Sequence, residues 1–216
     1  MDPEILHRSP LFRGLEGDAL NGALRFFHAQ AHSFRRGEAL NRVGEPVHRF
    51  GLLLAGSVQV FMDDLDGNHM LMASVTPGNT FAESLCFLGE EAKVRIECMT
   101  DSEVLMMDTA SIVRPDGVPT AMERELTGRF ISMLARRALD FNDRIQILCK
   151  PTIREKVTTL LSQYVAREGS PCVTLPFNRE AMATYLGVNQ SALSRELSRM
   201  QREGILRFSG STFRIL

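Results

Sequence analysis

The sequence of 216 residues predicts an α+β protein with a β domain, one long helix and a small C-terminal domain of helices and short strands. Three patterns support this prediction. Seven glycines between Gly37 and Gly89 separate short apolar segments, which is typical of β sandwiches and barrels. Apolar residues then recur at helical spacing over residues 121–148, and the segment after Pro151 alternates helical patterns with short β patterns.

Residues 2–30 are expected to form short helices, because Leu20, Leu24 and Phe27 recur at helical spacing. In the glycine-rich region that follows, "SVQVFM" alternates apolar and other residues as a half-buried strand does. The next stretch, "DDLDGN", is rich in turn-forming residues, so we expect a hairpin whose second strand is "HMLMASV". Two further strands, at residues 93–99 and 103–108, would complete the β domain.

The long helix at residues 121–148 carries an apolar seam that Arg137 interrupts. Two interpretations are open: the helix packs on its own β domain, or two copies of the chain pair along it in parallel. The dimer is favoured, because a lone helix of this length has little else against which to bury its seam. The seam consists of Leu126, Phe130, Met133, Phe141, Ile145 and Leu148, of which the first four are the predicted dimer interface.

Pro151 is expected to end the long helix, with "LCKP" as a short hinge. The expected division is therefore a β domain at residues 1–117, a dimerisation helix and hinge at 118–150, and a C-terminal domain at 151–216.

The C-terminal domain is predicted to contain three helices and a β hairpin. A helix at residues 152–167 is followed by the short strand "CVTLP" and by a helix that Asn178 would cap. Gly187 breaks that helix, and the next begins at Asn189 or Gln190. Two strands around "SGS" then form a wing, which gives the order of a winged helix-turn-helix.

The last of these helices has a face suited to reading DNA. If its apolar residues Leu193, Leu197 and Met200 face inward, short polar groups and arginines face outward. Such groups reach base edges in the major groove, and an arginine can bridge O6 and N7 of guanine. Arg195 is the predicted base reader, and Arg199 the predicted phosphate contact. The full predicted DNA-binding set is Arg179, Gln190, Ser191, Ser194, Arg195 and Arg199. A polar face used for protein contact is the alternative.

Charge is divided unevenly along the chain. From Pro151 onward nine Lys and Arg face five Glu, a net charge of +4, so residues 1–150 carry −5 of the overall −1. This asymmetry indicates that only the C-terminal domain meets a polyanion.

Several other classes of protein are not indicated by the sequence. It has no nucleophile with a nearby base, no phosphate-binding loop and no metal-ligand spacing, so we expect no enzymatic activity. Without a long apolar run or a secretory signal, the expected location is the cytoplasm. The four cysteines lie far apart and are expected to be buried, reduced thiols; Cys86 or Cys98 as a redox switch is the alternative.

Two segments carry a resemblance to a known family. "NREAMATYLGVNQSALSRELSRMQREGIL" resembles the DNA-binding segment of the cyclic-AMP receptor protein and fumarate–nitrate regulator (CRP/FNR) family. "LLLAGSVQVFMDDLDGNHMLMASVTPGNTFAES" is similar to the cyclic-nucleotide-binding-like β-roll, a jelly roll, of the same family. The resemblance implies a homodimeric transcription regulator that binds inverted half-sites of double-stranded DNA, works with RNA polymerase, and repositions its DNA-binding domains through the long helix when an effector binds.

Two departures from the family pattern bear on what the protein recognises. Ser194 and Arg195 match the family's base-reading pair, whereas Ser191 stands where well-known members have glutamate, which changes the expected half-site. Nucleotide-binding members hold the cyclic phosphate with an Arg-Ser pair, for which this chain offers Ala92 and Lys93. Cyclic AMP is therefore not the expected effector.

The expected effector pocket consists of Glu83, Ser84 and Lys93, with Ala82-Glu83 as the counterpart of the family's "GE" segment. An iron–sulfur cluster is not expected either, because no cysteine precedes Cys86. Haem stays open through five histidines, although surface or packing roles are favoured for them: His7, His28, His32, His48 and His69. A cyclic-nucleotide-like protein-interaction module with vestigial DNA binding is the alternative function.

Overall fold

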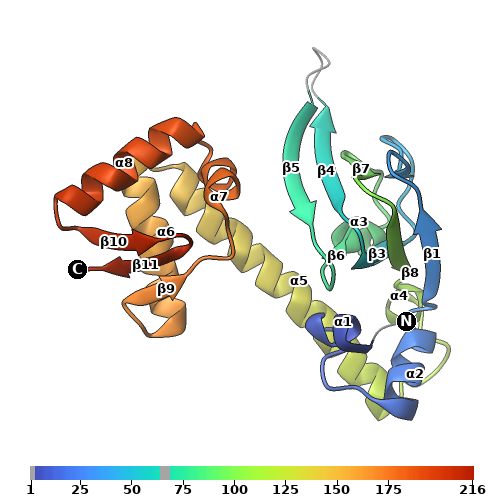
Figure 1. The fold of residues 1–216 in the computed structure, drawn as a ribbon. Helices are drawn as coiled ribbons and strands as arrows, with labels where there is room; N and C mark the ends of the chain where they lie inside the picture. Colours follow the sequence, from blue (N-terminus) through green and yellow to red (C-terminus); the bar gives the residue numbers. More distant parts are fainter. Residues whose placement is uncertain (1–2, 64–68) are drawn as a thin grey trace. The chain divides into compact units, whose positions relative to one another are not determined.

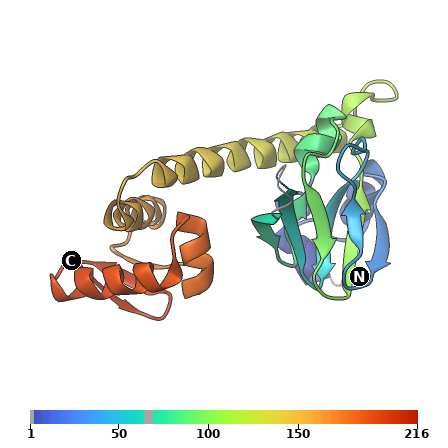
Figure 2. The ribbon, with the colours of Figure 1, turned by 90° about the horizontal axis from the view of Figure 1, so that it is seen from above.

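The computed structural model describes residues 3–63 and 69–216 (Figure 1). It divides the chain into two compact units, one ending at Ala135 and the other beginning at Arg136. The boundary falls inside the longest helix, α5 (Ala121–Leu148), which Figures 1 and 2 show as one unbroken helix. The predicted boundaries, 117/118 and 150/151, differ from this division because each half of α5 packs on a different unit.

The first unit opens with α1 (Pro3–Arg8) and α2 (Gly17–Phe26) and then forms two four-stranded antiparallel sheets. In the first sheet the order is β1-β8-β3-β6, and in the second it is β2-β7-β4-β5. Two short helices, α3 (Glu83–Leu88) and α4 (Ala110–Val113), complete the unit together with the first half of α5. The strands are β1 (Gln30–Phe34), β2 (Ala39–Asn41), β3 (Phe50–Ala55), β4 (Val58–Asp63), β5 (His69–Val75), β6 (Thr80–Phe81), β7 (Arg95–Cys98) and β8 (Ser102–Met107).

The first half of α5 belongs to the core of the first unit. The ring of Phe130 is fully buried and lies 5.6 Å from that of Phe50 and 5.7 Å from that of Phe87, centroid to centroid. Leu126 and Met133 are also buried in this core, at 2% and 6% exposure. The prediction that Leu126, Phe130 and Met133 form a dimer interface is therefore wrong, because their own β domain covers them.

The second unit holds the C-terminal domain. After the second half of α5 come α6 (Ile153–Glu168), β9 (Cys172–Thr174), α7 (Arg179–Leu186) and α8 (Gln190–Arg202). The hairpin of β10 (Leu206–Ser209) and β11 (Thr212–Ile215) then closes a three-stranded sheet in the order β10-β11-β9. In Figure 1, α8 lies along one side of this hairpin. The predicted fold class, a jelly-roll β domain, a long helix and a winged helix-turn-helix, is confirmed.

Local side-chain caps explain where the C-terminal helices begin. The hydroxyl of Thr152 accepts a hydrogen bond from the amide of Glu155, whose carboxylate accepts the Thr152 amide in return, a capping box that starts α6. Asn178 caps α7 as predicted, through a 2.8 Å bond from the amide of Ala181. These caps satisfy amides that have no partner within the helix.

The structure differs from the sequence prediction in several elements of the first unit. The helix predicted to reach Gln30 ends at Phe26, and Gln30 begins β1. Neither α3 nor α4 was expected, because each is too short to show a helical repeat. Of the turn predicted at residues 63–68, Asp63 ends β4, and residues 64–68 lie outside the described residues. None of the described helices combines the length and apolar character that crossing a membrane requires.

Candidate nucleic-acid interface

The turn between α7 and α8 is set by two residues. Gly187 ends α7 with φ of +62°, a left-handed conformation that costs glycine little. Asn189 then caps α8: its Oδ1 accepts hydrogen bonds from the amides of Ser191, at 2.9 Å, and Ala192, at 3.4 Å. This Gly187-to-Asn189 turn fixes the angle at which α8 leaves α7.

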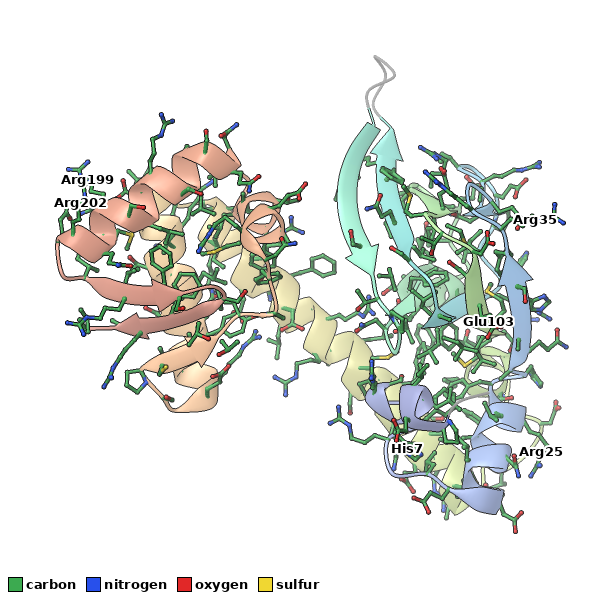
Figure 3. The ribbon with its side chains drawn as sticks, in the orientation of Figure 1. His7, Arg25, Arg35, Glu103, Arg199 and Arg202 are labelled. Atoms are coloured by element: carbon green, nitrogen blue, oxygen red, sulfur yellow. The ribbon has the colours of Figure 1, made fainter. Side chains whose placement is uncertain are left out.

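The buried stripe of α8 matches the prediction, since Leu193 and Leu197 are fully buried and Met200 is 1% exposed. Their packing turns the opposite side of the helix to solvent. Figure 3 shows Arg199 and Arg202 projecting from that side. The structure places five of the predicted DNA-binding residues on this exposed surface: Gln190, Ser191, Ser194, Arg195 and Arg199.

Arg202 was not among the predicted residues, although it lines the same shallow groove on α8 as Ser194, Arg195 and Arg199. Its spacing of seven from Arg195 and three from Arg199 is the signal that could have found it. The groove has a volume of about 610 Å³ and brings three guanidinium groups to one face.

The predicted base reader, Arg195, and the predicted phosphate contact, Arg199, differ in their surroundings. Arg199 donates from Nε to the carboxylate of Glu203 at 2.9 Å. Within the described ranges, 3–63 and 69–216, no residue accepts a hydrogen bond from the guanidinium of Arg195, and none forms an ion pair with it. Arg195 therefore keeps all its donors available for a ligand, which suits bidentate recognition of a base.

A charge network below the groove ties α8 to α6. Arg154 of α6 reaches Glu196 of α8 and Glu203, the residue that follows α8, each at 2.7 Å. Hydrogen bonds from Arg154 and then Arg199 hold the pKa of Glu203 below its usual range. Glu196 and Glu203 are thus both paired with arginines within the domain, which leaves the outer arginines to set the sign of the surface.

Ser191 and Arg179 have roles inside the domain. The hydroxyl of Ser191 donates to the Oδ1 of Asn189 at 2.6 Å, so it supports the cap of α8. Arg179 lies over the rings of Phe208 and Phe213, at 5.0 and 5.5 Å, and donates to the carbonyl of Gly210 at 3.3 Å. Burial lowers the pKa of Arg179. Arg179 therefore braces the wing, and its contact with DNA stays a prediction.

Comparison with protein families gives two matches. Residues 31–114 match the cyclic nucleotide-binding domain, and residues 155–216 match the Crp-like helix-turn-helix domain. Together they span most of the chain, in this order. The chain belongs to the CRP/FNR family.

Individual relatives agree with the family. The transcriptional activator protein FnrA of Stutzerimonas stutzeri is 22% identical over 92% of this chain and 80% of its own length. FixK2 of Bradyrhizobium japonicum is a solved structure with a TM-score of 0.53 and 26% identity, over 87% of this chain and 92% of its own. The c-di-GMP-responsive regulator CLP of Xanthomonas campestris has a TM-score of 0.58 and 16% identity, over 93% and 99% of the two chains, and shows the fold alone. As a CRP/FNR protein, this chain is a DNA-binding transcription regulator.

The expected effector-pocket residues of this CRP/FNR chain differ in their exposure to solvent. Glu83 is buried, at 3% exposure, and its carboxylate accepts the hydroxyl of Thr80. Ser84 is exposed, and Lys93 projects to solvent beside Glu90, with 3.8 Å between its Nζ and the carboxylate. One of the three side chains is thus buried and two are exposed, and their joint effector pocket stays a prediction.

Two alanines lie at positions that the sequence resemblance aligns with the family's nucleotide-binding motifs. Ala82 precedes α3 with φ of +64°, a conformation that strains residues with a Cβ atom. Ala92, which the sequence resemblance aligns with the family's phosphate-binding arginine, is 2% exposed. Its amide donates to the carbonyl of Glu45 at 2.9 Å, and its carbonyl accepts from the amide of Gly44. The methyl group of Ala92 is therefore buried.

The histidines and cysteines are dispersed through the described part of the chain. His28 pairs with Asp108 at 2.9 Å, and His7 contacts the carbonyl of Leu15. His32 and His48 are exposed on β1 and before β3, and the side chain of His69 lies outside the described part. Within the described residues no group of three His, Cys, Asp or Glu is arranged to hold a metal ion. Cys86 and Cys98 are buried, and burial raises the pKa of both thiols. Cys149 and Cys172 are exposed, so the prediction of four buried thiols is wrong for these two.

Proposed function

We propose that this protein acts as a homodimer, formed along α5, whose two α8 helices read inverted DNA half-sites. The apolar side chains left exposed on α5 support the dimer: Phe141 is 62% exposed, Ile145 56% and Leu148 41%. With Ala138 they follow the alternating spacing of three and four that pairs two helices. A second α5 would remove this row from water, which is favourable for apolar surface.

Reading of the bases falls to the N-terminal half of α8. The observation that carries this assignment is the exposed guanidinium of Arg195, which no described residue engages. We assign Arg195 to guanine, Gln190 and Ser194 to neighbouring base edges, and Arg199 and Arg202 to phosphates. In a two-fold dimer the half-sites are then expected about one helical turn apart, ~34 Å from centre to centre.

The effector of the β domain is proposed to be a ligand other than cyclic AMP. The buried methyl group of Ala92 and the solvent-exposed Lys93 support this, because neither supplies the bidentate donor that a buried phosphate needs. Binding of the effector is proposed to act on the DNA-binding domains through α5. A regulator of this kind would work in the cytoplasm with RNA polymerase, as membership of the family implies.

The homodimer and its DNA binding are tested with one double variant. Replacing Phe141 and Ile145 by Glu places two charges in the proposed seam, so sedimentation should report monomers and affinity for a palindromic site should fall to that of a single half-site. Glu at Asn142, which is exposed between them, is the matched control and should leave the dimer intact. A monomeric double variant that binds the palindrome at full strength contradicts the proposal. A wild-type protein that shows no salt-dependent binding to promoter DNA would instead favour a protein-interaction role.

The visible absorption spectrum of the purified protein and calorimetry with cyclic AMP test the effector. We expect no heat of binding with cyclic AMP, and micromolar affinity for it would contradict the proposal. An absorption band that follows the protein through purification would identify a bound chromophore such as haem.

A further inference from the structure

The second half of α5 has a polar face that is attached to the winged helix in the same unit. Arg167 of α6 places its Nη2 2.9 Å from the carboxylate of Asp140 and 2.6 Å from that of Asp143, both on α5. One guanidinium thus bridges two carboxylates. Asp140 and Asp143 are three residues apart in the sequence, which makes them neighbours on the surface of the helix.

Further contacts continue this attachment to α6 and α7. The side-chain amide of Gln163 donates to the backbone carbonyl of Asp143 at 3.0 Å, and Ile147 is fully buried in the core of the unit. The guanidinium of Arg144 lies 5.2 Å above the ring of Tyr185, a residue of α7. Residues 136–148 therefore form part of the body that carries α8.

The exposed apolar row of the same segment lies on an adjacent face. Each of these residues follows a residue of the attached face by one position, about 100° or a little over a quarter of a turn around the helix. The exposed row is Phe141, Ile145 and Leu148, and the attached face holds Asp140, Arg144 and Ile147. One side of this segment is thus held by α6 and α7, while the next side is free to meet a second copy. The proposed dimer seam and the DNA-reading helix belong to one compact unit.

We propose that Arg167 is a positioning residue that sets the spacing of half-sites accepted by the dimer; this inference rests on the proposed homodimer. By clamping Asp140 and Asp143, Arg167 fixes the seam face of α5 relative to α8. If α8 can move relative to the seam face within one unit, the distance between the two reading helices varies. The dimer has two such units, so both movements add to this variation. With the Arg167 ion pairs in place, the dimer should bind palindromes of other half-site spacings weakly. Without these ion pairs, it should bind them more nearly as well as the optimal palindrome.

The test uses the full-length protein and a series of labelled palindromes whose half-sites are separated by the optimal distance or by one or two base pairs more or fewer. A duplex with a single half-site completes the series. We expect the wild type to prefer the optimal spacing sharply, and Arg167→Ala to lose about 3- to 10-fold of that preference, as the loss of two half-exposed ion pairs allows. Affinity for the single half-site and the sedimentation coefficient should not change.

Two variants serve as controls. Arg136→Ala removes the same charge from an exposed position on α5 and should leave the spacing profile unchanged. Arg167→Lys keeps a cation between the carboxylates and should restore much of the preference. If Arg167→Ala does not fold, the pair Asp140→Asn and Asp143→Asn weakens the same contacts with side chains of equal size and takes its place.

The results separate the inference from the function on which it rests. An unchanged spacing profile in a folded Arg167→Ala dimer overturns the inference, as does an equal loss of affinity for palindromes and for the single half-site. A wild-type protein that binds no palindrome more tightly than one half-site contradicts the proposed homodimeric function itself.

Discussion

Substitution of Arg195 by alanine tests whether this residue reads a base or holds the DNA backbone. In the structure its guanidinium is exposed and has no partner among the described residues, so its removal leaves no group of the protein unpaired. Alanine is also the best helix former, and the buried stripe of α8 is untouched. The substitution should therefore leave the free energy of unfolding unchanged within about 0.5 kcal/mol.

The magnitude on DNA follows from the assigned contact. A bidentate contact to guanine discriminates by about 1 to 3 kcal/mol, which corresponds to roughly a 5- to 150-fold loss of affinity on the cognate site. Non-cognate DNA should lose far less, because there Arg195 contributes mainly one charge. Preference at one base pair in each half-site should relax.

Arg199 provides the comparison, since it stands one helical turn away and carries the same charge. Arg199→Ala removes a surface pair with Glu203, whose carboxylate Arg154 continues to hold. If Arg199 meets a phosphate, its loss weakens cognate and scrambled duplexes alike and reduces the slope of log affinity against log salt by about 0.9. Arg25→Ala, on α2 of the other unit and labelled in Figure 3, is a control for the loss of one charge.

The assay is fluorescence anisotropy on cognate and scrambled duplexes at several salt concentrations. Equal losses on both duplexes for Arg195→Ala would refute the reasoning, because they would mean that Arg195 holds the backbone.

Three further predictions concern stability and assembly. Phe130→Ala should lower the free energy of unfolding by about 3 to 5 kcal/mol because that ring is fully buried, whereas Phe141→Ala, at a 62% exposed site, should change it little and instead weaken the dimer in sedimentation. Comparable unfolding losses for both would contradict this assignment of the two halves of α5. Ala82→Gly should raise the free energy of unfolding by about 0.5 to 1 kcal/mol in thermal or chemical denaturation, because the φ of +64° at Ala82 suits glycine. A destabilised variant would show that the alanine methyl group is needed there. The pKa of Glu203 is lowered in the folded state, so its contribution to stability is present above about pH 4.5 and is lost as the pH falls below it. Glu203→Gln should make the free energy of unfolding depend less on pH in this acid range. An unchanged pH dependence would argue against the network.

The sequence by itself determined most of the C-terminal domain. The caps at Asn178 and Asn189, the break at Gly187 and the buried stripe of α8 all depend on residues within a few positions of one another. Interactions of such short range leave periodic signals in a single sequence. For the same reason, the exposed position of Gln190, Ser194 and Arg195 could be predicted from the stripe alone.

Only the tertiary structure decided which partner each apolar or charged group meets. The helical repeat of α5 identified Phe130 and Phe141 alike, but burial by Phe50 and Phe87 separates the first from the second. Likewise, nothing near Arg179 in the sequence indicates that its guanidinium would lie over aromatic rings of the wing. Helical periodicity reports which side of an element avoids water, whereas the identity of the group that covers that side depends on residues far away in the chain.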